Sequence, residues 1–258
     1  MNKKIKRKIL VVDDEINVCK SICQAILSED YEIDTSLSGE EALRKDIEKN
    51  YDLIITDLMM PGISGMDLLK TLKTSRPDVN VIMITGYPSI KTAVQSIKIG
   101  AFDYISKPFT PNELRTLVNR AIKKIESEEQ DIKEELPSKM PPGLFYMSGH
   151  TWLRKKEENL AAVGVMFDFL KTIGTVISLE LPKENTNIFQ GEVCARITDS
   201  EKNIHRVWSP SSGRIVEVNE KLKRNYSLLI NDPYHDGWLF VIKTTNLEED
   251  VKGLEVSK

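Results

Sequence analysis

Acidic residues stand at the ends of short apolar runs in the first half of the sequence. Asp13 and Asp14 directly follow the run KILVV, and Asp57 closes the run DLIIT. If these runs are parallel strands, their carboxyl ends meet at one edge of a sheet and the three carboxylates lie together. Carboxylates held this close repel one another, and an all-oxygen site with room for water and phosphate suits Mg²⁺. The pattern therefore predicts a magnesium-dependent phosphoryl site.

A hydroxyl and a lysine follow the next two apolar runs. Thr85 ends VIMIT, and Lys107 follows DYIS just before Pro108. Both side chains are donors that suit an incoming phosphoryl group. A single aspartate or Lys-Pro at a strand end is more often an ordinary turn residue. Here such residues recur in order at the ends of four strands, which favours one shared site.

Alternating strand and helix patterns must position these side chains. KILVV, DLIIT, VIMIT and DYIS are continuous apolar runs, and YEIDTS is a weaker one. Continuous runs are typical of strands covered on both faces, so we expect an α/β fold with a five-stranded, doubly wound parallel sheet. Two helix starts have the spacing of a capping box. They are Ser38 with Glu41, and Thr110 with Glu113.

The motifs of this half resemble those of the receiver domains of two-component response regulators. VVDDE, ITDLMMPGISGMDLL, MITGY and DYISKPF match that family in order, over residues 6–125. The resemblance implies a flavodoxin-like fold and a sensor histidine kinase that phosphorylates Asp57, an example of covalent carboxylate chemistry. The ligands of Mg²⁺ would be the carboxylates of Asp13, Asp14 and Asp57 and the backbone carbonyl of Met59.

The same resemblance assigns the remaining residues of the site. Thr85 and Lys107 would contact the phosphoryl group. The burial of Tyr104 would follow Thr85 when the domain switches. A half-buried aromatic on an edge strand is also ordinary packing, so the switching role is the weaker part of this assignment.

An acidic and then proline-rich linker occupies residues 126–142. A stripe of apolar residues enters it at helical spacing: Val118, Ile122, Ile125, Ile132 and Leu136. One interpretation is an extended helix that supports a homodimer, through the linker or the receiver itself. A solvated helical spacer is the other interpretation. The prolines mark the boundary of the second domain.

Composition limits the classes of function. The chain has 258 residues, a net charge of −3 and 40% hydrophobic residues, which fits two soluble domains. No apolar run approaches the ~20 residues that span a bilayer, and the start has no signal-peptide pattern, so we expect a cytoplasmic protein without membrane association. The three cysteines lack CxxC spacing, which argues against a disulfide framework or a structural zinc site.

Residues 143–250 have short apolar segments separated by Gly, Pro and Asn, among them GTVISLEL, GRIVEV and GWLFVIK. This pattern is typical of a β-rich domain, and only VMFDFLKTIG has helical spacing. Acidic and basic residues nearly balance in this half, and no helix-turn-helix pattern is present. We therefore expect no nucleic-acid partner.

The second half resembles the H protein of the glycine cleavage system, a lipoyl carrier. The resemblance runs through GHTWLR, VGVMFDFLKTIGTVISLELP, GEVCARITDSEK, WSPSSGRIVEVNEKL and NDPYHDGWLFVIK. It implies a barrel-sandwich hybrid fold. Counted back from Ser209-Pro210, Lys202 occupies the position of the lipoyl lysine at a hairpin tip. The resemblance thus implies lipoate bound covalently to Lys202 by a lipoate ligase or lipoyltransferase.

The residues around Lys202 depart from the pattern of that family. Glu201 and Asn203 flank Lys202 where the family has small residues, and His205 and Arg206 replace small or acidic ones. A changed charge beside an acceptor alters which enzymes recognise it. Service in glycine cleavage would add three partners: glycine decarboxylase, aminomethyltransferase and dihydrolipoyl dehydrogenase.

Two hypotheses for the whole chain follow, and neither makes it a classical enzyme. In the first, phosphorylation of Asp57 controls a lipoyl domain that carries an aminomethyl or related group on Lys202. In the second, the H-like domain is not lipoylated and serves as an adaptor that binds a partner protein under receiver control.

Overall fold

Five parallel strands form the sheet of the first half. They are β1 (Arg7–Val12), β2 (Tyr31–Ser36), β3 (Leu53–Asp57), β4 (Asn80–Thr85) and β5 (Asp103–Ser106). Their order in the sheet is β2-β1-β3-β4-β5, and every pairing is parallel. The strand order reverses between β1 and β3, which makes the space beyond their carboxyl ends the expected ligand site.

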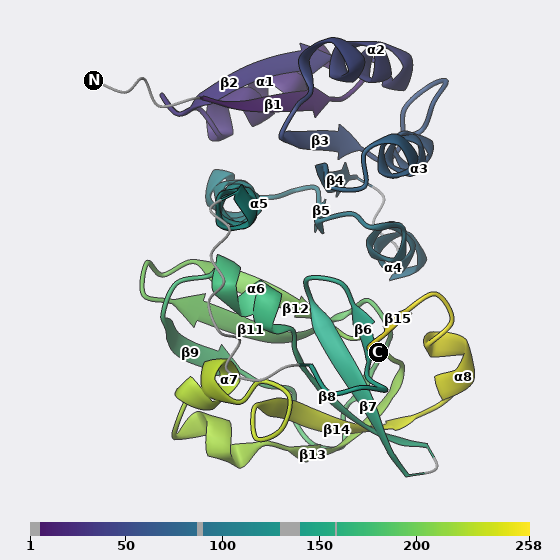
Figure 1. The fold of residues 1–258 in the computed structure, drawn as a ribbon, viewed down its shortest axis with the longest axis vertical. Helices are drawn as coiled ribbons and strands as arrows, with labels where there is room; N and C mark the ends of the chain where they lie inside the picture. The colour runs from purple at the N-terminus through teal and green to yellow at the C-terminus, as the bar shows by residue number, and fades with distance from the viewer. Residues whose placement is uncertain (1–5, 87–89, 130–139, 158) are drawn as a thin grey trace. The chain divides into compact units, whose positions relative to one another are not determined.

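Five helices cover both faces of this sheet (Figure 1). They are α1 (Ile16–Ala25), α2 (Gly39–Lys49), α3 (Gly65–Ser75), α4 (Ile90–Ile99) and α5 (Pro111–Glu129). Helices α1 and α5 pack on one face, where Cys19, Ile22, Leu114 and Val118 join strand residues in one buried cluster. Helices α2, α3 and α4 contact one another in a row on the other face. The doubly wound α/β fold expected from the sequence is confirmed.

The structure is a computed structural model that describes residues 6–86, 90–129, 140–157 and 159–258. It divides into two compact units after residue 130. Most of the linker, including Ile132 and Leu136 of the apolar stripe, lies outside the described residues. The prediction of a linker-mediated homodimer depends on these residues and stays a prediction. Among the described residues, no helix is both long and apolar enough to cross a membrane.

The two predicted capping pairs both contribute hydrogen bonds at helix starts, and the pair at α5 forms the complete capping box. The Ser38 hydroxyl accepts a hydrogen bond from the backbone N–H of Glu41 at 3.2 Å, at the start of α2. The carboxylate of Glu41 in turn accepts the N–H of Leu37 at 3.0 Å. At the start of α5 the exchange is reciprocal: Glu113 accepts the N–H of Thr110 at 2.9 Å, and the Thr110 hydroxyl accepts the N–H of Glu113 at 3.2 Å. These bonds satisfy backbone donors that a helix leaves unpaired in its first turn.

We predict that Glu41→Gln lowers stability in a pH-dependent way. Hydrogen bonds from Lys45 and the N–H of Leu37 lower the pKa of Glu41 to about 2. The stabilisation is therefore complete above the ordinary pKa of about 4.3 and declines as the pH falls toward 2. Urea titrations at pH 7 should show a loss of about 1 kcal/mol, which shrinks below pH 4. A loss that stayed constant down to pH 3 would contradict this assignment.

The last turn of α5 is tied to the first strand of the sheet. Arg7 donates hydrogen bonds to both carboxylate oxygens of Glu129, at 2.7 and 2.5 Å. The hydrogen bond from Arg7 lowers the pKa of Glu129. The Glu129 carboxylate is therefore paired with a residue of the same unit.

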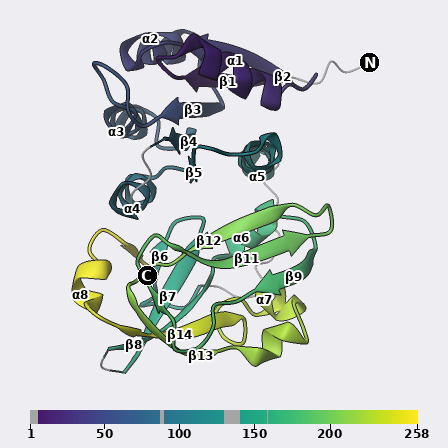
Figure 2. The same ribbon diagram turned by 180° about the vertical axis from the view of Figure 1, so that it is seen from behind.

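The described residues of the second unit form ten strands in two antiparallel sheets. They are β6 (Phe145–Met147), β7 (Thr151–Glu157), β8 (Leu160–Val165), β9 (Val176–Glu180), β10 (Asn187–Ile188), β11 (Val193–Asp199), β12 (Ile204–Trp208), β13 (Gly213–Val218), β14 (Trp238–Thr244) and β15 (Glu255–Val256). The larger sheet has the order β10-β13-β14-β8-β7-β6-β15, and the smaller has the order β12-β11-β9. Figure 2 shows β9, β11 and β12 side by side. The β-rich fold expected for this half is confirmed.

A buried core joins the two sheets of the second unit. It includes Trp152, Phe240 and Phe169, the last from helix α6 (Phe167–Thr172), which is the helix predicted from VMFDFLKTIG. Three short helical segments complete the unit: η1 (Glu220–Lys223), α7 (Ser227–Asn231) and α8 (Leu247–Asp250). Gly164 is required by this packing, because a Cβ atom there would lie 2.3 Å from the ring of Trp152.

Candidate functional site

The acidic residues predicted from strand ends do converge in the first unit. Asp57 is the last residue of β3, and Asp13 is the first residue after β1. Because β1 and β3 are neighbours in the sheet, both side chains lie at the same edge. Both are largely buried, with exposed fractions of 2% for Asp13 and 7% for Asp57. Burial of two carboxylates requires a positive partner.

Lys107 supplies that positive charge. Its Nζ donates a hydrogen bond to Asp13 Oδ2 at 2.8 Å and another to Asp57 Oδ1 at 2.7 Å. Lys107 follows β5, and its backbone N–H bonds the carbonyl of Thr85 at 2.7 Å, which fixes the start of the side chain. Burial alone would lower the pKa of Lys107, but the hydrogen bonds to the two carboxylates outweigh it and the pKa is raised.

Met59 and Asp14 lie at the same edge. Met59 contacts Asp57 through its backbone, whereas the side chain of Asp14 is exposed. The backbone N–H of Met59 donates to Asp57 Oδ2 at 2.6 Å, so each oxygen of Asp57 accepts a hydrogen bond. The side chain of Met59 points to solvent, with 61% of it exposed. Asp14 is exposed beside Asp13. The loop after β1 is shaped by Asp13 Oδ1, which accepts the N–H of Glu15 at 3.0 Å.

The donor set at this edge fits Mg²⁺ in its chemistry. Asp13 and Asp57 bring two carboxylates to one amine, and exposed Asp14 adds a third nearby. One lysine cannot neutralise three carboxylates, and oxygen-only ligands are those that Mg²⁺ selects. Within the described ranges, no group of three or more His, Cys, Asp or Glu side chains has metal-site geometry. At this edge the Lys107 amine lies between the two buried carboxylates.

Thr85 and Tyr104 lie on one face of the sheet. The register pairs Met83 with Tyr104 and Thr85 with Ser106, and side chains of paired residues share a face. Thr85 is fully buried, and Tyr104 is 4% exposed. Both side chains are therefore buried on the same face, and the switching role of Tyr104 stays a prediction.

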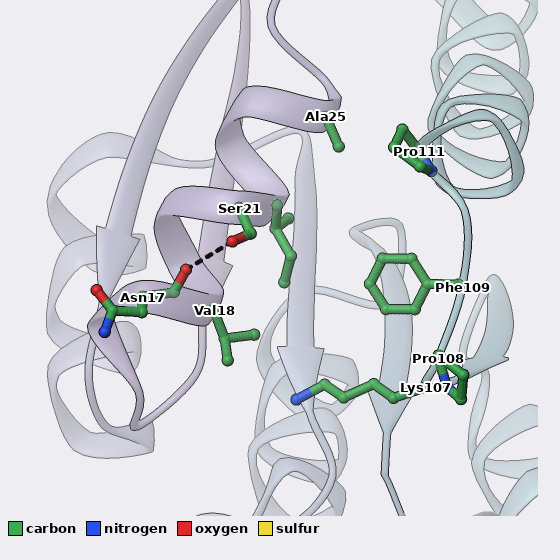
Figure 3. Close-up of a pocket in the computed structure, with 9 residues that line it drawn as sticks. Asn17, Val18, Ser21, Ala25, Lys107, Pro108, Phe109 and Pro111 are labelled. Atoms are coloured by element: carbon green, nitrogen blue, oxygen red, sulfur yellow. Dashed lines mark hydrogen bonds between the residues drawn. The ribbon is translucent and has the colours of Figure 1, made fainter.

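An apolar groove borders Lys107. Helix α1 contributes Val18, Ser21 and Ala25 to one wall, and Phe109 and Pro111 from the segment after β5 form the other (Figure 3). The cavity has a volume of about 400 Å³. In Figure 3 the Lys107 side chain runs across the end of this groove.

Lys202 lies in the turn between β11 and β12 of the second unit. Its side chain is exposed, and its backbone has a φ of 65°, in the left-handed region. The turn is closed by hydrogen bonds from Asp199 N–H to the Asn203 carbonyl at 3.1 Å and from Lys202 N–H to the Asp199 carbonyl at 2.9 Å. The expected hairpin location of Lys202 is thus present.

The role of Asp199 in this turn was missed by reasoning from the sequence. Its buried carboxylate accepts the N–H groups of Glu201 and Asn203 and bonds the ring of His205. An aspartate that opens a turn is a known signal for such bonds to the backbone. The bond to His205 has no local sequence signal, because it depends on the register of the hairpin.

Comparison with known families separates the chain into the same two parts. Residues 9–119 match the family described as "Response regulator receiver domain". Residues 144–258 match the family described as "Glycine cleavage H-protein". Together the two matches cover most of the chain without overlapping.

Curated relatives match the first part. The transcriptional regulatory protein ResD of Bacillus subtilis is 38% identical over 125 residues, which are 47% of this chain and 52% of ResD. The regulatory protein AtoC of Escherichia coli is 33% identical over 126 residues, which are 49% of this chain and 27% of AtoC. The chain therefore spans about half or less of these relatives.

Solved structures resemble each part. A receiver domain from Clostridium thermocellum is 37% identical, covers 46% of this chain and 97% of its own, and has a TM-score of 0.45. A glycine cleavage system H protein from Mycobacterium marinum is 26% identical, covers 41% of this chain and 87% of its own, and has a TM-score of 0.38.

Proposed function

Because residues 9–119 belong to the response regulator receiver family and residues 144–258 to the glycine cleavage H-protein family, we propose that this chain is a phosphorylation-controlled carrier protein. A histidine kinase phosphorylates Asp57. The phosphorylation state then controls how the H-protein domain presents a lipoyl group on Lys202 to partner enzymes.

The observation that carries this proposal is the exposed position of Lys202 in a closed hairpin turn. A carrier needs an amine that an acylating enzyme can reach while the domain stays folded. Lys202 meets both needs, because its side chain is exposed while backbone hydrogen bonds close the turn. The strand edge with Asp13, Asp57 and Lys107 supports the regulatory half of the proposal.

The chemistry at Asp57 is a transfer of one phosphoryl group. An oxygen of the Asp57 carboxylate attacks the phosphorus of a phosphohistidine, the P–N bond breaks and an acyl phosphate forms. The hydrogen bonds from Lys107 and the N–H of Met59 hold the carboxylate in place before attack. The Lys107 amine and the Thr85 hydroxyl then donate to oxygens of the phosphoryl group.

Magnesium belongs to this proposal as a cofactor of the first domain. Asp13, Asp14, Asp57 and the backbone carbonyl of Met59 would hold it. Its double positive charge would offset the excess negative charge that the carboxylates and a phosphoryl group create.

The chemistry at Lys202 is formation of an amide. A lipoate ligase supplies lipoyl-adenylate, the neutral Nζ attacks its carbonyl carbon, and AMP leaves as the amide forms and a proton is lost. The attached lipoyl group supplies a dithiolane on a long flexible arm that transfers an aminomethyl or related group between enzymes. Glycine decarboxylase, aminomethyltransferase and dihydrolipoyl dehydrogenase are the candidate enzymes.

We predict that Ser21→Arg weakens phosphorylation by the kinase about tenfold or more, because it introduces bulk and charge into the groove beside Lys107. Phosphorylation by acetyl phosphate, which needs no docking, should stay within twofold. Rates of both reactions with radiolabelled donors check this expectation. Gln24→Arg, an exposed substitution on α1 outside the groove, is the matched control. Equal kinase rates for both variants would argue against docking in the groove.

Mass spectrometry of the protein purified from its own host tests the central proposal. A lipoyl adduct on the peptide that contains Lys202 is the expected result. Unmodified Lys202, in a host whose other carriers are lipoylated, would overturn the carrier proposal. It would favour an unmodified adaptor that binds a partner protein.

The adaptor is the second candidate because of Glu201. This exposed carboxylate lies next to Lys202 and accepts a hydrogen bond from the Asn203 side chain at 3.3 Å. A fixed negative charge beside the acceptor amine changes its recognition by a ligase. Capture of a partner that depends on phosphorylation of Asp57, by a chain without lipoate, would support this candidate.

A further inference from the structure

The carboxylate of Asp199 is the centre of the turn that presents Lys202. Its Oδ1 accepts the backbone N–H groups of Glu201 at 2.9 Å and Asn203 at 3.0 Å. Its Oδ2 accepts the Asn203 amide at 3.3 Å and contacts His205 Nε2 at 2.8 Å. Asp199 and His205 are each 2% exposed, so their contact is shielded from solvent. These bonds fix the backbone on both sides of Lys202.

The turn needs such support because of the conformation of Lys202. A φ of 65° is unfavourable for a lysine, whose side chain cannot bond its own backbone as that of asparagine does. A conformation of this kind persists when surrounding contacts determine it. The Asp199 carboxylate provides those contacts directly before and after Lys202.

His205 ties the carboxylate to the core of the domain. It lies on β12 opposite Ile197 of β11, which is fully buried. Its ring meets the ring of Phe169 edge-on, with 6.5 Å between centroids. A second buried histidine, His150, also lies near Phe169, with 6.0 Å between ring centroids. Packing on Phe169 therefore holds the His205 ring in the place where it meets Asp199.

We propose that the Asp199–His205 pair is the positioning element for the acceptor lysine. The pair connects the Lys202 turn to the domain core and presents the amine in one preset conformation to the enzyme that acylates it. This inference rests on the proposed carrier function. It assigns a role to His205, which stands where the resemblance to H proteins predicts a small residue.

The charge of Asp199 is consistent with this role. Burial alone would raise its pKa, but the hydrogen bonds from His205 and Asn203 outweigh burial and lower it. The carboxylate is therefore ionised at neutral pH and remains a strong acceptor for the N–H groups of the turn.

Three substitutions in the full chain test the role of the pair. His205→Leu removes the donor to Asp199, and His205→Gln keeps an amide N–H near the position of Nε2. His150→Leu is the matched control, because His150 is equally buried and its ring also packs against Phe169, whereas Asp199 bonds His205. Near-UV circular dichroism verifies that each variant is folded.

Lipoylation kinetics with a purified lipoate ligase give the first readout. The apparent affinity of the ligase for the chain falls with the fraction of molecules whose turn is in the competent conformation. We therefore expect His205→Leu to raise KM about tenfold and to leave kcat within about twofold of the wild type. His205→Gln should recover most of the loss. His150→Leu should keep the wild-type KM even if it lowers thermal stability. A general loss of structure would instead lower the active fraction for both leucine variants.

Amide hydrogen exchange gives a second readout that does not need lipoylation. In NMR spectra, exchange at the N–H groups of Glu201 and Asn203 should be about tenfold faster in His205→Leu and unchanged in His150→Leu. If His205→Leu fails to fold, isosteric Asp199→Asn takes its place with the same expectation in direction. Wild-type exchange and wild-type KM in a folded variant of the pair would overturn the inference.

The two readouts separate this inference from the proposed function. If the ligase never modifies the wild-type chain, the carrier proposal fails, and exchange at Glu201 and Asn203 alone decides whether the pair organises the turn. If the wild type is lipoylated and His205→Leu matches it in both measurements, the carrier proposal stands and the positioning role is wrong.

Discussion

Replacing Lys202 with arginine is expected to abolish lipoylation of the chain. Arginine keeps the positive charge and most of the length of the side chain, but its guanidinium group stays protonated and is not a nucleophile toward an activated carboxyl group. Incubation with lipoate, ATP and a lipoate ligase, followed by intact mass measurement, should give full conversion of the wild type and no adduct on the variant.

A second lysine provides the control for this experiment. Lys221 is exposed in the same domain and forms an ion pair with Asp236 at 3.0 Å. Lys221→Arg should be lipoylated at the wild-type rate. An adduct on the Lys202→Arg variant at any other lysine would contradict the assignment of Lys202 as the acceptor.

Replacing Asp57 with asparagine is expected to abolish phosphorylation of the chain. The amide has no anionic oxygen to attack phosphorus, and it also removes one of the two carboxylates that contact Lys107. With acetyl phosphate and Mg²⁺, phosphate-affinity electrophoresis should resolve a slower band for the wild type and none for Asp57→Asn. The domain should stay folded, because Asp13 still pairs with Lys107.

An exposed carboxylate of the same domain provides the control. Asp67 lies in the first turn of α3 and forms an ion pair with Lys70 at 3.1 Å. Asp67→Asn should be phosphorylated as the wild type is. Phosphate on Asp57→Asn would show that another residue is the acceptor.

The two variants together test the coupling of the domains. Asp57→Asn should still accept lipoate on Lys202, and Lys202→Arg should still accept phosphate on Asp57. Only the wild type should change its carrier turnover when acetyl phosphate is added. If turnover were the same with and without phosphate, the chain would carry two independent activities and the regulatory proposal would be wrong.

The sequence predicted the strands of the first domain well for a physical reason. A strand buried on both faces must be apolar at nearly every position, so runs such as DLIIT and VIMIT indicate β3 and β4 directly. Parallel strands then bring their carboxyl ends to one edge, which is why the convergence of Asp13 and Asp57 could be predicted. The capping pairs at α2 and α5 could be predicted because each joins residues only three apart in the sequence.

The contacts within each site required the tertiary structure. Lys107 reaches Asp13 across 94 residues of sequence, and nothing in either motif says that its amine bridges Asp13 and Asp57. The contact of His205 with Asp199 depends on the pairing register of β11 with β12 and on an irregularity beside Asp199 in its pairing with β9. A shift of one residue would turn His205 to the opposite face of its strand.

The sequence by itself thus determined the two domains, the strand edge that gathers the acidic residues and the hairpin position of Lys202. The strand edge follows from periodicity and from residue types at fixed spacing, whereas the hairpin position of Lys202 follows from the resemblance to H proteins. The tertiary structure decided which atoms meet: the amine between two carboxylates in the first domain, and the carboxylate beneath the lysine turn in the second. Hydrogen bonds between distant segments depend on strand register and side-chain packing, and both are set only when the whole domain folds.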